Sequence, residues 1–223
     1  MEYLYETHCH CDQGSRCARS SAVELVRAYR AAGYAGLVLT DHFVTGNTAV
    51  DRSLPWEDQM RCYYGAYLEA KQVGDALDFD VLFGIEHACE GGEFLCYGID
   101  LNFLLDNPDI PALSLEEFVE RVRGYGAVVV QAHPFRWAPA DTPLRRALLD
   151  GIEVYNAANA PEANQAALAA AFGICTSGGD VHFAGDERIG RAGIILPHRV
   201  KTAAELAATL RSGEYRIHSE NGK

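Results

Sequence analysis

The feature that most constrains the fold of this chain is a repeated pairing of a short apolar run with His, Asp or Glu at its end. Five runs of this kind read as β-strands and occupy residues 3–10, 36–42, 80–87, 127–133 and 173–182. In the first run, His8 and His10 are two residues apart. On an extended backbone both rings would point to the same face, where they can bind one metal ion. The chain is therefore expected to gather metal-binding side chains at strand ends.

Helical patterns lie between these runs. The first has Ser20 or Ser21 as its N-cap candidate, and Ser114 caps a later one. Helices are expected over residues 21–33, 56–76, 114–124, 144–149, 161–172 and 202–210. Apolar strands that alternate with helices indicate an α/β fold with a parallel sheet. A doubly wound open sheet also places ligands at strand ends, but only a closed barrel brings so many of them to one point.

Composition limits the possible partners. The 223 residues carry a formal net charge of −12, which opposes nonspecific binding to nucleic acid or to an anionic membrane. A small anionic substrate remains compatible, since a metal cluster supplies local positive charge. No apolar run approaches the roughly 20 residues of a membrane span, and the N-terminus has no signal-peptide pattern. Seven cysteines without CxxC spacing predict no disulfide framework, so we expect a cytoplasmic protein. With no linker or repeat, residues 1–223 are expected to form one domain.

Five short motifs occur in one order along nearly the whole chain: His8-x-His10, Thr40-Asp41-His42, Gly84-Ile85-Glu86, Ala132-His133-Pro134 and Gly179-Asp180-x-His182. In this combination the chain resembles the PHP (polymerase and histidinol phosphatase) superfamily, and its spacing is similar to that of the small stand-alone members. The resemblance implies a distorted (β/α)7 TIM-like barrel. It also implies a metal-dependent phosphoesterase.

The resemblance further implies a centre of two divalent ions, zinc, manganese or iron, with a third ion left open. The residues it assigns to the first two are His8, His10, Glu86, Asp180 and His133. Among them, Glu86 would bridge the two ions. Glu93 stands where the family often has a histidine, and a carboxylate there favours Mn²⁺ or Fe²⁺.

A third ion would be held by His42 and His182. The family joins them with an Asp or His in the loop after the first motif, where this chain has about Ser15, with Asp12 and Asp41 nearby. Asp41 can alternatively orient a histidine. If the third ion is absent, His182 or His42 could protonate the leaving alkoxide, so both are catalytic candidates together with Asp180.

A phosphoryl group also needs cations for its remaining oxygens, and guanidinium groups match that geometry. Arg136 is the first candidate, followed by Arg16 and Arg191. The loops expected to set specificity are 11–20, 45–55 and 134–142.

The leading hypothesis is a phosphoesterase, histidinol-phosphatase-like or nucleotide-phosphatase-like, that hydrolyses a small phosphomonoester with metal-activated hydroxide. The alternatives are another metal-dependent hydrolase, amidohydrolase-like, or a metal-binding module without activity. The expected partner is the small phosphorylated substrate. No membrane and no stable nucleic-acid partner are expected.

Overall fold

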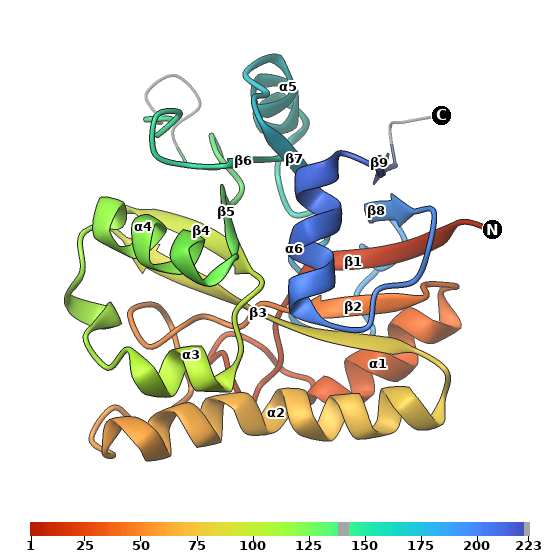
Figure 1. Ribbon diagram of the computed structural model, residues 1–223. Coiled ribbons are helices and arrows are strands. Elements are labelled where there is room, and N and C mark those ends of the chain that lie inside the picture. The colour runs from red at the N-terminus through yellow and green to blue at the C-terminus, as the bar shows by residue number, and fades with distance from the viewer. Residues whose placement is uncertain (138–142, 221–223) are drawn as a thin grey trace.

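The computed structural model describes residues 1–137 and 143–220, in which nine strands form one strongly curved sheet (Figure 1). The order across the sheet is β7-β6-β5-β4-β3-β2-β1-β8-β9. The strands are β1 (Tyr3–Cys9), β2 (Gly36–Leu39), β3 (Asp80–Cys89), β4 (Gly92–Tyr97), β5 (Val128–Gln131), β6 (Gly151–Asn156), β7 (Ile174–Gly178), β8 (Ala192–Leu196) and β9 (Arg216–Ser219). The sheet is nearly closed, which confirms the predicted barrel class, although the number of strands differs.

Closure is made where β7 meets β1. The Thr7 hydroxyl donates to the Ser177 carbonyl at 2.8 Å, and the Asp180 backbone N–H donates to the His8 carbonyl at 2.7 Å. A bridge pairs Cys9 with Val181 just beyond. These bonds join the segment of the first predicted metal-binding motif, His8-x-His10, to that of the last, Gly179-Asp180-x-His182.

The prediction of a wholly parallel sheet was wrong. Strands β1, β2 and β3 are parallel, as are β5, β6 and β7, but β4 runs antiparallel to both β3 and β5, and β8 is antiparallel to β1 and β9. The β3–β4 connection is a two-residue turn at Glu90 and Gly91, both at positive φ. Such a turn forces a hairpin, because a parallel return needs a long crossover.

The helices mostly follow the predicted patterns. They are α1 (Ala22–Ala31), α2 (Trp56–Ala76), α3 (Leu101–Asp106), α4 (Leu115–Tyr125), α5 (Pro161–Ala169) and α6 (Ala203–Ser212), with a 3₁₀ turn η1 (Ile110–Ala112). Of the two N-cap candidates, Ser21 forms the capping box of α1, with Glu24. The expected helix at 144–149 is wrong. The segment makes one turn through bonds to the Arg145 carbonyl, too short for a helix to propagate.

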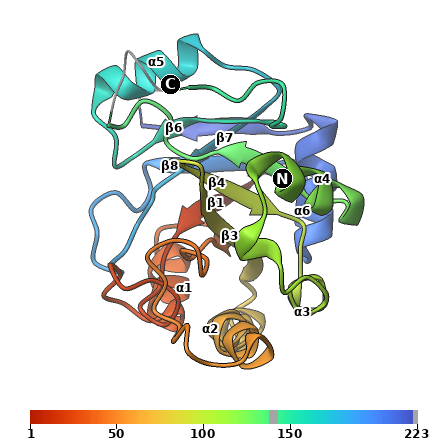
Figure 2. The same ribbon diagram turned by 90° about the vertical axis from the view of Figure 1, so that its left-hand side faces the viewer.

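Apolar side chains fill both sides of the sheet. Val38 packs with Tyr5, Leu82 and Val130 in one cluster, while Leu37 faces the α1 and α2 side. Figures 1 and 2 both show α1 and α2 below the sheet and α5 at the opposite end. Because the interior is packed, polar residues gather at the strand ends.

No helix among the described residues combines the length and the apolar character that a bilayer crossing requires.

Candidate metal centre

The centre begins at the end of β1, where two buried imidazoles meet. His8 and His10 are both fully buried, and their Nε2 atoms are 3.1 Å apart. Two ring nitrogens at this separation repel each other unless a proton or a metal cation lies between them. The extended backbone thus places both rings on one face, as the sequence predicts.

Glu86 lies on β3 at the middle of the cluster and is 1% exposed. Its Oε1 is 3.0 Å from His133 Nε2 and 3.3 Å from His8 Nε2, whereas its Oε2 is 2.7 Å from His42 Nδ1. One carboxylate therefore contacts rings carried by β1 and by the segments that follow β2 and β5. Glu86 therefore belongs to two of the side-chain groups that could hold a metal ion.

Asp180 closes the cluster from the segment after β7. It adopts a positive φ of 51°, a conformation that Asp and Asn tolerate better than other side chains. Its Oδ1 is 3.2 Å from His10 Nε2 and 3.6 Å from His8 Nε2, and its Oδ2 is 2.7 Å from Arg136 Nη1. The structure thus brings Asp180 to the HxH pair.

Glu93, His42 and His182 form the more accessible edge. Glu93 is one-third exposed, and its carboxylate lies 3.5 Å from His133 Nε2 and 3.9 Å from His42 Nδ1. The His182 ring stacks on His10 with centroids 4.3 Å apart. The β3–β4 register explains the place of Glu93: it pairs with Ala88, two positions beyond Glu86 on the same face.

These donors fit divalent metal ions. Four overlapping groups bring one ligand atom of each member within 4.8 Å of the others: His8 with His10 and Asp180, His8 with Glu86 and His133, His42 with Glu86 and Glu93, and His10 with His42 and His182. Although His42 Nδ1 and Glu86 Oε2 are close, neither has a correctly directed hydrogen bond within the described residues. Buried lone pairs of this kind suit a cation, and mixed nitrogen and oxygen donors suit zinc, manganese or iron.

The buried carboxylates and imidazoles of the centre shift one another's pKa values. Burial raises the pKa of Glu86, but His8, His133 and His42 more than offset it, so the pKa lies well below its usual range. For His42, burial lowers the pKa, yet contacts with Cys17 and Glu86 raise it to about 10. Burial lowers the pKa of His10 to about 3. Ions would displace the proton of His42, so metal binding is expected to strengthen as the pH rises.

Glu153, on β6, is a buried carboxylate that supports the centre and that the sequence analysis did not single out. Its Oε1 is 3.1 Å from His8 Nδ1, and its Oε2 accepts the His133 backbone N–H at 2.7 Å. Holding a proton on His8 Nδ1 leaves Nε2 free to face the cluster. The residue lies within a strand, so a search of strand ends misses it.

Glu6, within β1, plays a comparable supporting role. Its carboxylate accepts the backbone N–H groups of His8 at 2.9 Å and Gly179 at 2.8 Å, and also the Tyr29 hydroxyl at 2.9 Å. Burial raises the pKa of Glu6 to about 7. The carboxylate thus fixes the backbone of the first and last motifs relative to each other.

The loop after β1 differs from the expectation for a third ion. Ser15 Oγ lies 3.1 Å from His10 Nδ1 and donates to Asp41 Oδ1 at 2.7 Å, so it orients neighbours rather than facing His182. Asp12 is exposed, and Asp41 accepts the Cys11 backbone N–H. Cys17, which the sequence analysis did not single out, lies in this loop, and His42 and His182 influence the pKa of its thiol.

The environment of Cys17 leads to a testable reactivity. Burial raises the pKa of the thiol, but contacts with His182 and His42 lower it to about 6. In metal-free protein, the rate of Cys17 alkylation by iodoacetamide is therefore expected to rise to half its maximum near pH 6, well below the midpoint of about 8.5 for free cysteine. Peptide mass spectrometry measures this rate. A Cys17 rate that follows the free-cysteine curve would contradict the expected influence of His42 and His182 on the thiol.

The three candidate arginines lie in different places. Arg136 reaches the cluster, where Nη1 contacts Asp180, and it donates to Asn156 and Asn159 at 2.7 Å each. Arg16 is exposed beside the 45–55 loop, where its backbone N–H bonds Asn47. Arg191 pairs with Glu187 and Glu220. The structure does not bring Arg16 or Arg191 to the convergent groups.

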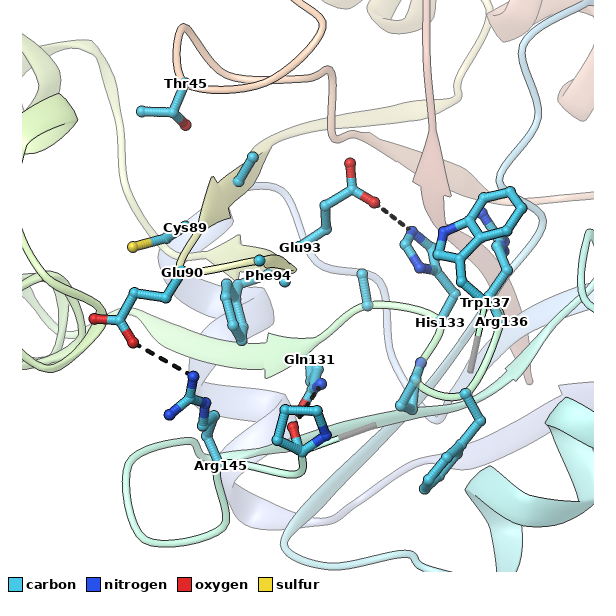
Figure 3. Close-up of a pocket in the computed structure, with 17 residues that line it drawn as sticks. Thr45, Cys89, Glu90, Glu93, Phe94, Gln131, His133, Arg136, Trp137 and Arg145 are labelled. Atoms are coloured by element: carbon cyan, nitrogen blue, oxygen red, sulfur yellow. Dashed lines mark hydrogen bonds and ion pairs between the residues drawn. The ribbon is translucent and has the colours of Figure 1, made fainter. Parts of the chain in front are cut away.

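A cavity of about 610 Å³ opens beside the centre (Figure 3). The turn between β3 and β4, the end of β5 and the segment that follows it form its wall. Glu93, His133 and Arg136 line it on the side of the centre. Of the predicted specificity loop 134–142, residues 138–142 lie outside the described residues. The cavity size is typical of small-molecule sites.

Comparison by sequence identifies no relative: no protein-family model and no curated protein matches this chain. Comparison by structure does. A two-domain protein from Bacteroides vulgatus that contains a predicted PHP-like metal-dependent phosphoesterase superposes with a TM-score of 0.67 at 15% identity, covering 98% of this chain. The present chain spans 65% of that protein's length.

Two further structures share the fold. An amidohydrolase from Chromobacterium violaceum, with bound sulfate and no metal, gives a TM-score of 0.60 at 15% identity and covers 96% of this chain and 97% of its own. Endonuclease Q, in complex with duplex DNA containing an abasic lesion, superposes with a TM-score of 0.62 at 11% identity. The match covers 97% of this chain and 58% of the Endonuclease Q chain. This chain therefore shares the fold of these three proteins.

Proposed function

We propose that this protein, whose fold is that of PHP-like phosphoesterases, is a metal-dependent phosphoesterase that hydrolyses a small phosphomonoester. The observation that carries the proposal is the convergence of His8, His10, Glu86 and Asp180 next to a guanidinium and an open cavity. A phosphoryl group needs positive charge around its oxygens and an open path from solvent. Bound ions and the Arg136 guanidinium would supply the charge, and the cavity supplies the path.

The residues proposed to hold the first ion are His8, His10, Glu86 and Asp180, with Glu86 shared and His133 and Glu93 completing a second position. His42 and His182 are proposed for a third. When bound, divalent ions would neutralise phosphoryl oxygens and make hydroxide available near neutral pH. The carboxylates among these residues are compatible with manganese and iron, and the histidines with zinc.

Arg136 is proposed to bind the phosphoryl group. Asn156 and Asn159 fix its guanidinium, so little side-chain entropy is lost when an anion binds.

If no third ion binds, His182 or His42 is proposed instead to deliver the proton that the leaving oxygen requires. Burial lowers the pKa of His182, but contacts with Cys17 and Asp180 raise it above its ordinary value. A ring that keeps its proton at neutral pH can act as a general acid. Both rings are partly exposed at the edge of the centre, where a leaving group can reach them.

Hydrolysis of a carbon–nitrogen or carboxylic ester bond is the second candidate. The Chromobacterium neighbour favours it, because that amidohydrolase matches over nearly the whole length of both chains. A nuclease role, as in Endonuclease Q, is less compatible with a net charge of −12.

The test is phosphate release by metal-stripped protein reloaded with Mn²⁺, Fe²⁺ or Zn²⁺. The substrates are sugar phosphates, nucleotides and histidinol phosphate, with amides and carboxylic esters in parallel. We expect metal-dependent phosphate release from at least one phosphomonoester. Protein that demonstrably holds metal but yields only amine or carboxylate products would favour the second candidate, and protein that yields no product would favour a binding module.

A further inference from the structure

The cavity beside the centre has two ends of different chemistry. Figure 3 shows Glu93 with His133 on one side and Glu90 with Arg145 well separated from them on the other. The first pair belongs to the metal centre. The second forms no hydrogen bond or ion pair with the centre among the described residues, so a ligand group bound there would lie away from the reacting end of a substrate.

Arg145 is the lining arginine that retains an incompletely neutralised charge. Arg136, the other arginine of the cavity wall, directs its guanidinium nitrogens to Asp180, Asn156 and Asn159. Arg145 has a single ion pair among the described residues, a 3.5 Å contact with Glu90. At that distance the contact is too long for a good hydrogen bond.

Glu90 is itself engaged elsewhere. Its Oε1 accepts the backbone N–H of Leu115, the first residue of α4, at 3.1 Å. The partial positive charge of a helix N-terminus stabilises a carboxylate there. Part of the negative charge of Glu90 is therefore compensated by α4, and Arg145 is left able to bind another anion.

We propose that the end of the cavity at Arg145 binds a second anionic group of the substrate, a carboxylate or a phosphate on the leaving group. This inference rests on the proposed phosphoesterase function and adds the substrate class. The phosphoryl group lies at the metal centre, and the leaving group extends past the β3–β4 turn to Arg145. The other acidic residue lining the cavity, Glu93, belongs to the centre, so Arg145 supplies the attraction at the far end.

The test uses a homologous series of ω-phosphorylated carboxylic acids of three to six carbons. Each is paired with its neutral primary amide and with the α,ω-bisphosphate of equal length, so the arms distinguish the two anions. Metal-loaded wild-type protein is expected to prefer at least one anionic compound over its amide by about tenfold in kcat/KM, the scale of a charge-assisted hydrogen bond. In Arg145→Gln that preference is expected to vanish, with the amide rates kept within about twofold.

A matched control is Arg146→Gln. The neighbouring Arg146 donates to the Ala170 carbonyl and stacks on Phe172, and it does not line the cavity. The Arg146→Gln variant should keep the full preference for the anionic compound over its amide. The Arg145→Lys variant, which retains the positive charge, should keep part of it. Calorimetric binding of the corresponding ω-carboxyalkyl phosphonates gives a readout independent of turnover, and Arg145→Gln should weaken it by a similar factor.

The outcomes separate the two proposals. Phosphate release without a preference for anionic leaving groups contradicts this inference. So does an equal loss of kcat/KM for the acid and its amide in Arg145→Gln. Either result leaves the proposed function standing. No phosphate release from any compound by metal-loaded protein contradicts the proposed function and this inference with it.

Discussion

Replacement of Glu86 by Gln is expected to abolish turnover and to weaken metal binding by more than about 100-fold. Loss of a residue that only supports a metal ligand typically lowers metal affinity or activity by about 10–100-fold. Glu86 is proposed to be a ligand itself, so its loss should cost more. Its carboxylate oxygens lie within 3.3 Å of His8, His133 and His42, and an amide keeps the volume but loses the charge. Elemental analysis after dialysis and phosphate release measure both effects.

The same substitution has a control on the surface. Glu120→Gln, on the exposed side of α4, changes the same functional group away from the centre and should leave metal content and turnover unchanged. Circular dichroism should show that both variants are folded. Retention of the wild-type metal content and activity by Glu86→Gln would contradict the assignment of Glu86 to the centre.

Gly178→Ala is expected to lower the free energy of unfolding by about 3 kcal/mol. Gly178 ends β7 against β1, where an added Cβ would overlap His8 Cβ and lie 2.6 Å from Glu153 Oε1. Both neighbours are fully buried and hydrogen-bonded to each other, so they cannot move without breaking the support of the centre. Chemical unfolding of the metal-free protein measures the change.

The reference variant is Gly65→Ala in α2, where an added Cβ meets nothing within 4 Å. Alanine in a helix interior should raise the free energy of unfolding by about 0.5–1 kcal/mol. If Gly178→Ala unfolds at the wild-type denaturant concentration, the close packing of β7 on β1 is not as described.

The strand-end pattern was enough to predict the barrel class and which segments meet, because apolar strands and their polar ends are local features. It could not predict strand direction. β4 reads like any other buried strand, and only the turn at Glu90 and Gly91 makes it antiparallel. Strands β8 and β9 lie in regions where no strand was predicted.

The supporting residues were harder to predict for a different reason. Glu6 and Glu153 lie inside β1 and β6, where a sequence pattern gives no sign that a carboxylate is buried and bonded to backbone N–H groups. Arg145 fell in a segment predicted to be helical, so its place on the cavity wall was hidden. The contacts of Glu6 with Gly179 and of Glu153 with His8 depend on closure of the barrel, which brings together residues more than 100 positions apart.

The most direct test of the central claim is anomalous X-ray diffraction from crystals grown with Mn²⁺ or Zn²⁺. We expect an ion bound by His8, His10, Glu86 and Asp180 at about 2.0–2.2 Å, and a second ion on the His133 side of Glu86. Ions found only at surface carboxylates, with no anomalous peak among these side chains at saturating metal, would contradict the assignment of the cluster as a metal centre.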